Sequence, residues 1–233
     1  VQRGLTPVSN ALAYATLFRC VMAGSSQPVQ ERTPELEHPS GTTIDAAFSV
    51  GYINAYVTGL DSYGFHALET LQCMVERRGT GEVGVAWLET FRGERFWEAH
   101  HNRIWSRDLF ETALCRSHTL TPGRKGFNHT FPTIDELKDL VEDPIAYHYQ
   151  HTDGLKCTMF LMRGLVQDFN FAAHMSDSTI LSTQMYLPMP PARTTLANFF
   201  SPQVNNVEQM FLSGKASYPI ERTLLTTGLV AAA

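Results

Sequence analysis

Apolar positions along the chain repeat with two different periods, and together they predict a mixture of helices and strands. Between Tyr63 and Arg78, apolar residues recur every three or four positions, which is typical of a helix with one buried face. The segments Ala46–Val57 and Val83–Phe91 are instead rich in β-branched, aromatic and small residues, which favours strands. Val21–Thr43 is rich in Pro, Ser, Gly and Thr, so we expect a connector with little regular structure.

Capping residues mark where further helices begin. Ser106 can cap a helix that runs to about Arg116. Thr133 and Glu136 have the spacing of a capping box, and the helix that follows must be short because Pro144 cannot continue it. The same reasoning predicts helices from Ser9 to Phe18, from Ser201-Pro202 to Gly214, and from Tyr218-Pro219-Ile220 to the C-terminus.

The second half of the chain carries a strand pattern in two consecutive hairpins. Asp153-Gly154 separates strands Ala146–His151 and Leu155–Arg163, and Ser176-Asp177-Ser178 separates Val166–Met175 from Thr179–Leu187. Consecutive hairpins form antiparallel sheet. We therefore predict an α+β fold, an open and mainly antiparallel sheet with helices packed on one face. The other face, from Ile145 to Leu187, is then expected to form the interface of a homo-oligomer.

Composition and charge narrow the function classes. The chain has 233 residues, 43% of them apolar, and a formal net charge of −5. No basic stripe is available to neutralise phosphates, so we expect no nucleic-acid partner. No apolar run is long enough to cross a bilayer, so no membrane partner is expected. The four cysteines are widely spaced, which favours free thiols in a reducing, cytoplasmic compartment.

Two apparent motifs fail on physical grounds. Gly79–Gly84 matches the glycine fingerprint of dinucleotide sites, but here a helix precedes the loop and a strand follows it. The loop would therefore offer the pyrophosphate the negative end of a helix dipole. His148 and His151 stand three residues apart in one predicted strand, so their side chains point to opposite faces. We expect no metal site.

His66 is the strongest candidate for chemistry. It lies in the first turn of the helix predicted from Tyr63, where the helix dipole disfavours its protonated form and suits it to proton exchange near neutral pH. Thr70, Cys73 and Arg77 share its helical face, and Glu69 lies one turn away at the edge. From the residues alone, a structural role for this histidine remains open.

Two stretches resemble the glucose–fructose oxidoreductase / inositol dehydrogenase family. The first is the ending, Asn206–Lys215 followed by Pro219–Leu229, where that family has a helix, a Gly-Lys turn, a proline and a terminal helix. The second is Gly59–Met74, which is similar to the segment where the family places an Asp and, four residues later, a His that opens a helix of the substrate domain. His66 matches that histidine, but Ser62 stands four residues before it and Asp61 is displaced by one.

The resemblance implies a function and a division of the chain. Residues 1–20 would be the last helix of a missing nucleotide-binding domain, and residues 21–233 a substrate and oligomerisation domain. The full-length protein would use NAD or NADP, which this segment alone does not bind, to oxidise or reduce a small polar, sugar- or polyol-like substrate. In the family the histidine acts beside a lysine of the N-terminal domain, so His66 would be the catalytic acid/base. Asp61, Ser62, Glu69 and Arg77 would contact substrate.

Two other functions remain open for the same fold. Ser62 in place of the family aspartate, and the missing cofactor half, favour a non-catalytic binding or scaffold module. A lyase or isomerase that uses His66 without a redox cofactor is the third possibility.

Overall fold

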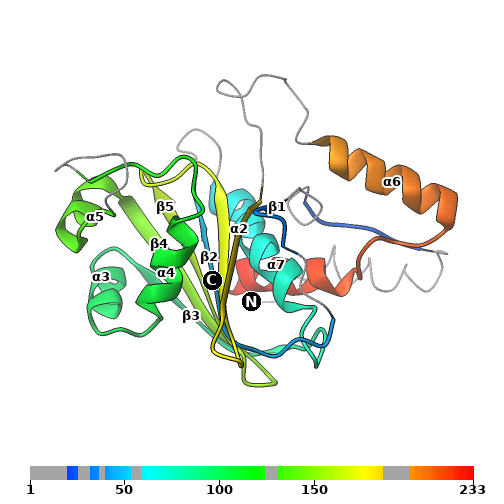
Figure 1. Cartoon of the computed structure of the whole chain (residues 1–233), viewed down its shortest axis with the longest axis horizontal. Helices are drawn as coiled ribbons and strands as arrows, with labels where there is room; N and C mark the ends of the chain where they lie inside the picture. The colour runs from blue at the N-terminus through cyan, green and yellow to red at the C-terminus, as the bar shows by residue number, and fades with distance from the viewer. Residues whose placement is uncertain (1–19, 26–31, 37–39, 54–58, 124–130, 186–199) are drawn as a thin grey trace.

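A seven-stranded sheet forms the centre of the molecule (Figure 1). The structure is a computed structural model and describes residues 20–25, 32–36, 40–53, 59–123, 131–185 and 200–233. The predicted helix Ser9–Phe18 lies outside these residues. The strands are β1 (Arg32–Thr33), β2 (Ile44–Gly51), β3 (Val85–Arg92), β4 (Glu142–His151), β5 (Lys156–Arg163), β6 (Phe169–Met175) and β7 (Ile180–Met185). Their order is β1-β7-β6-β2-β5-β4-β3.

The sheet is mainly antiparallel, which confirms the predicted α+β class. Both predicted hairpins form, β4 with β5 and β6 with β7. In the turns between them, Gly154 and Ser178 adopt positive φ angles of 95° and 69°. Among the described strands only β2 and β5 pair in parallel, with Ala47 opposite Cys157. β2 therefore inserts between the two hairpins and joins them into one sheet.

Helices cover both faces of the sheet, whereas the sequence pattern predicted them on one face. Helices α2 (Gly59–Val75) and α7 (Glu221–Ala232) pack on one side; α3 (Glu94–His101), α4 (Arg107–Leu114) and α5 (Ile134–Leu140) pack on the other (Figure 1). Successive side chains of a strand point to opposite faces, and on this sheet both faces carry apolar side chains that need cover. Ala47 belongs to the core beneath α2, whereas its neighbour Phe48 belongs to the core beneath α4.

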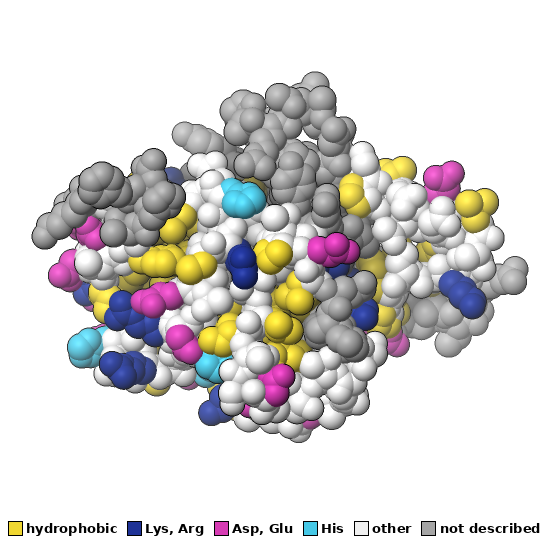
Figure 2. Space-filling model, viewed as in Figure 1, with side chains coloured by type: hydrophobic (Ala, Val, Ile, Leu, Met, Phe, Trp, Pro, Cys, Tyr) yellow, Lys and Arg dark blue, Asp and Glu magenta, His cyan; other side chains and the backbone are white. Residues whose placement is uncertain are grey.

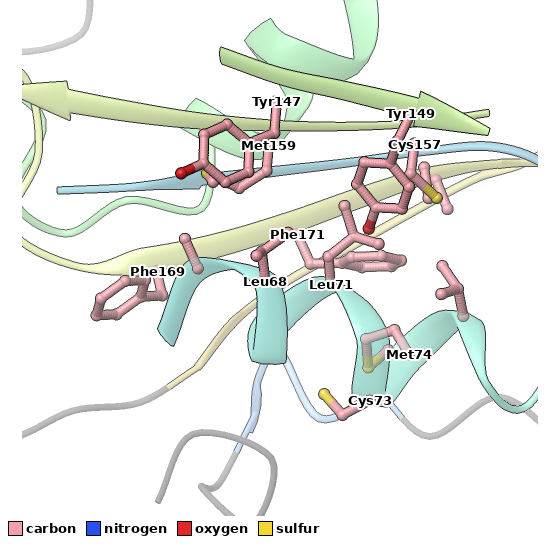
Figure 3. Close-up of a cluster of buried hydrophobic side chains, with 14 of the residues drawn as sticks. Leu68, Leu71, Cys73, Met74, Tyr147, Tyr149, Cys157, Met159, Phe169 and Phe171 are labelled. Atoms are coloured by element: carbon pink, nitrogen blue, oxygen red, sulfur yellow. The ribbon is translucent and has the colours of Figure 1, made fainter. Parts of the chain in front are cut away.

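The first core lies between α2 and the strands. Leu68 and Leu71 point from α2 toward Tyr147 and Tyr149 of β4 and Phe171 of β6 (Figure 3), and all five side chains are buried. Side chains of this size contribute about 1.5–3 kcal/mol each on burial. α2 is therefore fixed against the sheet along its length.

The second core is aromatic. Phe160 of β5 meets Phe48, Phe96 and Trp105 at ring-centroid distances of 4.7, 4.8 and 5.0 Å, in edge-to-face arrangements. Strands β4, β5 and β6 are consequently buried on both faces. The open sheet face expected between Ile145 and Leu187 does not exist in the described chain, because α3, α4 and α5 cover it. A homo-oligomer remains a prediction, but that surface is not accessible for it.

Capping chemistry was predicted well, and element boundaries less well. Ser106 accepts a hydrogen bond from the backbone N–H of Leu109 at 3.2 Å, and Thr133 with Glu136 forms the capping box. α2 begins at Gly59 in the described chain, one turn before the predicted start. α3 has no counterpart among the elements predicted from the sequence: Gly93 adopts a φ of 54° and leads directly into that helix.

Helix α6 (Ser201–Ser213) stands apart from the sheet (Figure 1) and has no buried residue among the described ones. Its side chains Val204, Phe211 and Leu212 are exposed. Figure 2 shows charged side chains of both signs scattered over the visible face, without a continuous basic field. Of the helices that the structure describes, none combines the length and apolar character needed to cross a bilayer.

Candidate functional site

A polar pocket of about 440 Å³ lies at the C-terminal end of α2. This volume is within the range of about 300–1,000 Å³ typical of small-molecule sites. Arginine and glutamate side chains from four parts of the chain line it: Arg32 of β1, Glu76 and Arg77 after α2, Glu82 of the following loop, and Arg222 of α7. We call this cavity the arginine pocket.

The backbone around the end of α2 brings these residues together. The N–H of Gly41 donates to the carbonyl of Arg77 at 2.8 Å, and the N–H of Gly79 donates to the carbonyl of Thr42 at 3.0 Å. Carbonyls at a helix end need such partners. Gly81 then adopts a φ of 67°, and the chain turns back so that Glu82 reaches Gln72. The loop that imitates a dinucleotide fingerprint therefore serves as a wall of the arginine pocket.

Arg222 is the most firmly held cation of the pocket. Its Nε donates to Glu76 Oε2 at 2.7 Å, its second nitrogen pairs with Oε1, and its guanidinium carbon lies 4.0 Å from the centre of the Tyr218 ring. The side chains of Arg222 and Glu76 are only 5% and 11% exposed. The remaining nitrogen, Nη1, is buried and has no hydrogen-bond partner among the described residues.

Arg32 and Arg77 add two more guanidinium groups to the same cavity. Arg32 Nη2 lies 3.9 Å from the sulfur of Cys73, which leaves α2 on the side away from the strands (Figure 3). Burial raises the pKa of the Cys73 thiol. The thiol therefore stays protonated and contributes an uncharged surface to the pocket. It is not suited to act as a nucleophile, because only the ionised thiolate does so.

Glu82 places a carboxyl group among these cations. One of its oxygens accepts a hydrogen bond from Gln72 Nε2 at 2.5 Å. The other, Oε1, is buried and has no hydrogen-bond partner within the described residues. Burial raises the pKa of Glu82 to about 7, so this group is partly protonated near neutral pH. Three arginines and two carboxyl groups thus line the pocket.

Glu69, a predicted substrate contact, lies behind the arginine pocket and does not line it. Its side chain is fully buried, and Thr226 of α7 donates a hydrogen bond to Oε1 at 2.9 Å. Burial raises the pKa of Glu69 to about 7. The carboxyl therefore connects α2 to α7 inside the protein.

His66, the predicted catalytic residue, lies two turns into α2, which contradicts its expected place in the first turn. Its ring packs near Tyr63 and Phe169, with the Phe169 centroid at 6.1 Å. Burial lowers the pKa of His66 and keeps it neutral. Its Nδ1 is buried and finds no hydrogen-bond partner in the described parts of the chain. Desolvation therefore lowers the pKa of His66, where the sequence predicted an effect of the helix dipole.

The predicted site residues do not form one cluster. Asp61 is exposed and Ser62 is half-buried, both in the first turn of α2, about one turn before His66. Arg77 lines the pocket at the other end, eleven residues after His66, or roughly 16 Å at about 1.5 Å per residue. His66 and Arg77 therefore cannot act on the same reacting atom.

Sequence reasoning missed Arg32, Glu82 and Arg222. Glu82 lies within the Gly79–Gly84 loop and Arg222 within the ending that carried the family resemblance, but no local pattern shows that the two meet.

Within the described parts of the chain, no group of three His, Cys, Asp or Glu side chains is arranged to hold a metal ion. No protein-family model matches the chain, and no curated protein has a significantly similar sequence.

Proposed function

We propose that this chain is a small-molecule binding domain whose arginine pocket takes a small organic anion. The observation that carries this proposal is the convergence of Arg32, Arg77 and Arg222 on one cavity. Guanidinium groups bind carboxylates and phosphates through paired hydrogen bonds, and they are favoured where such groups are recognised.

Besides the charge of Arg222, the fixed position of its guanidinium group favours binding of an anion. Glu76 and Tyr218 hold the guanidinium in place, so little side-chain freedom is lost when a ligand arrives. Its Nη1 is buried without a partner in the described chain, and an anion oxygen would satisfy it. The pocket lies partly out of water, where charge-assisted hydrogen bonds are stronger than at the surface.

The test is isothermal titration calorimetry with phosphate, citrate and a series of monocarboxylates. We expect at least one of these anions to bind, and Arg77→Ala to weaken it by about tenfold or more, since hydrogen bonds to charged groups contribute about 1.5–3 kcal/mol. Arg95→Ala is the matched control, because Arg95 is exposed and pairs with Glu89 on a different surface. Absence of binding to every anion, or equal affinity in the two variants, would overturn the proposal.

Proton transfer at His66 is a second candidate function. The specific observation is a half-buried imidazole whose pKa is lowered by desolvation and whose Nδ1 lacks a partner in the described chain. In the oxidoreductases that the sequence resembles, the matching histidine exchanges a proton with a sugar- or polyol-like substrate. The loop Gly79–Gly84, which has the dinucleotide pattern, follows a helix and so does not place a helix N-terminus at a pyrophosphate. Binding of NAD or NADP would therefore need residues other than this loop.

His66→Ala tests this candidate in the longest native form of the protein. With NAD or NADP and a panel of sugars and polyols, we expect the variant to lose nicotinamide reduction while its melting temperature stays nearly unchanged. His101→Ala, at an exposed position, is the control. A large fall in melting temperature would instead assign His66 a packing role beside Phe169.

A further inference from the structure

Glu82 is the one carboxyl group lining the arginine pocket that has an oxygen without a hydrogen-bond partner in the described chain. Both oxygens of Glu76, the other carboxyl, bind Arg222. Gln72 fixes Glu82 through the opposite oxygen, so the carboxyl is held in a defined orientation. Among the charged side chains that line the pocket, three are guanidinium donors and Glu76 is bound to Arg222, so Glu82 presents the one oriented carboxyl acceptor that is not already paired with an arginine.

A buried acceptor without a partner costs free energy, about 1–3 kcal/mol, unless a ligand or water satisfies it. A ligand that brings an acid group to the arginines and a donor to Glu82 satisfies both requirements. The donor can be a hydroxyl or an ammonium group. The three guanidinium groups repel an ammonium group, whereas a hydroxyl has no such cost.

We propose that the arginine pocket selects acids that carry a hydroxyl group beside the carboxylate, and that Glu82 is the residue that determines this specificity by accepting the hydroxyl hydrogen bond. The inference rests on the proposed function, since it presupposes that the arginines bind the carboxylate. The raised pKa of Glu82 agrees with it, because a partly protonated carboxyl is a poor counter-ion for an ammonium group.

Three ligands with one carbon skeleton provide the test: hexanoate, 2-hydroxyhexanoate and 2-aminohexanoate. Isothermal titration calorimetry at pH 7 should show 2-hydroxyhexanoate binding the wild-type protein about tenfold more tightly than either of the others. The ratio of affinities is the informative quantity, because a change that only loosens the pocket weakens all three ligands together.

Variants of Glu82 assign the effect to this residue. Glu82→Leu should bring the ratio of 2-hydroxyhexanoate to hexanoate affinity close to one, and Glu82→Gln, which keeps an acceptor oxygen, should retain part of it. Glu89→Leu is the control and should leave the ratio unchanged, since Glu89 is exposed on β3 beside Arg95. If Glu82→Leu does not fold, the wild-type ratio and Glu82→Gln still decide the matter.

The outcomes separate the two proposals. Equal binding of hexanoate and 2-hydroxyhexanoate overturns the role of Glu82 and leaves anion binding intact. Tighter binding of 2-aminohexanoate overturns the assignment of the donor as a hydroxyl. Failure of all three acids to bind, together with phosphate and citrate, overturns the proposed function itself.

Discussion

At the residue scale, the buried carboxyl of Glu69 should make stability depend on pH. Burial raises its pKa from 4.5 to about 7, so the folded state holds this proton more tightly than the unfolded state does. The contribution of this proton to the free energy of unfolding is complete below pH 4.5 and is lost as the pH rises to about 7. Glu69→Gln removes this loss, so relative to wild type the variant should gain up to about 3 kcal/mol between pH 4.5 and 7.5.

Urea denaturation at four or five pH values measures this difference. Glu98→Gln removes the same formal charge from an exposed position of α3 and corrects for the change in net charge. A constant difference between Glu69→Gln and wild type across this pH range would show that the buried carboxyl does not titrate there.

Two glycines provide a second contrast at this scale. Gly164 has a φ of 90°, and a Cβ atom there would lie 2.2 Å from the carbonyl oxygen of Leu140. Gly228 lies within α7 and would meet nothing within 4 Å. Gly164→Ala should therefore destabilise the protein by about 2 kcal/mol or more, and Gly228→Ala should stabilise it by about 0.5–1 kcal/mol. Thermal unfolding of both variants checks the opposite signs.

At the scale of elements, α7 is tied to α2 by the Glu76–Arg222 ion pair. Replacing Arg222 with Met leaves the Glu76 carboxylate buried and unpaired, which should cost about 3–5 kcal/mol. Replacing both, as Glu76→Gln with Arg222→Met, should cost much less than the sum of the single changes. A double-mutant cycle by urea denaturation measures this coupling.

The exposed Arg107–Glu111 pair within α4 is the matched control for that cycle. Its coupling should be about 0.5 kcal/mol or less, because water screens exposed pairs. Equal coupling in the two cycles would mean that α7 is held by its apolar contacts alone.

Helix starts and hairpin turns could be predicted from the sequence where the residues that form them are close together in the chain. Ser106, the Thr133 capping box and the Asp153-Gly154 turn act within four residues, and each was identified from the sequence. The parallel pairing of β2 with β5 joins segments about 110 residues apart and has no local signal. The arginine pocket could not be predicted for the same reason, since Arg32, Glu82 and Arg222 meet only after α2 and α7 have packed together. Arg77, by contrast, was identified because it directly follows a helix whose periodicity is clear.

At the scale of the whole molecule, the two cores share one sheet, and this should make unfolding cooperative. The chain has three tryptophans, Trp87, Trp97 and Trp105. Trp97 and Trp105 belong to the second core, and Trp87 packs on His148, which contacts Trp105 from the same face. Tryptophan fluorescence therefore reports on the side of the sheet opposite α2.

Leu68→Ala tests whether the first core controls the second. Leu68 is fully buried under α2, so its truncation should cost about 2–5 kcal/mol. Strands such as β2 connect the two cores, since β2 contributes Ala47 to one and Phe48 to the other. If they transmit the loss of stability, the unfolding transition followed by tryptophan fluorescence should move to lower urea concentration. The transition followed by circular dichroism should move with it. Leu109→Ala, in the second core, should shift both transitions in the same way. A tryptophan transition that stays in place in Leu68→Ala would instead show that the two layers unfold separately, and that α2 and α7 can loosen around the arginine pocket while the aromatic core remains folded.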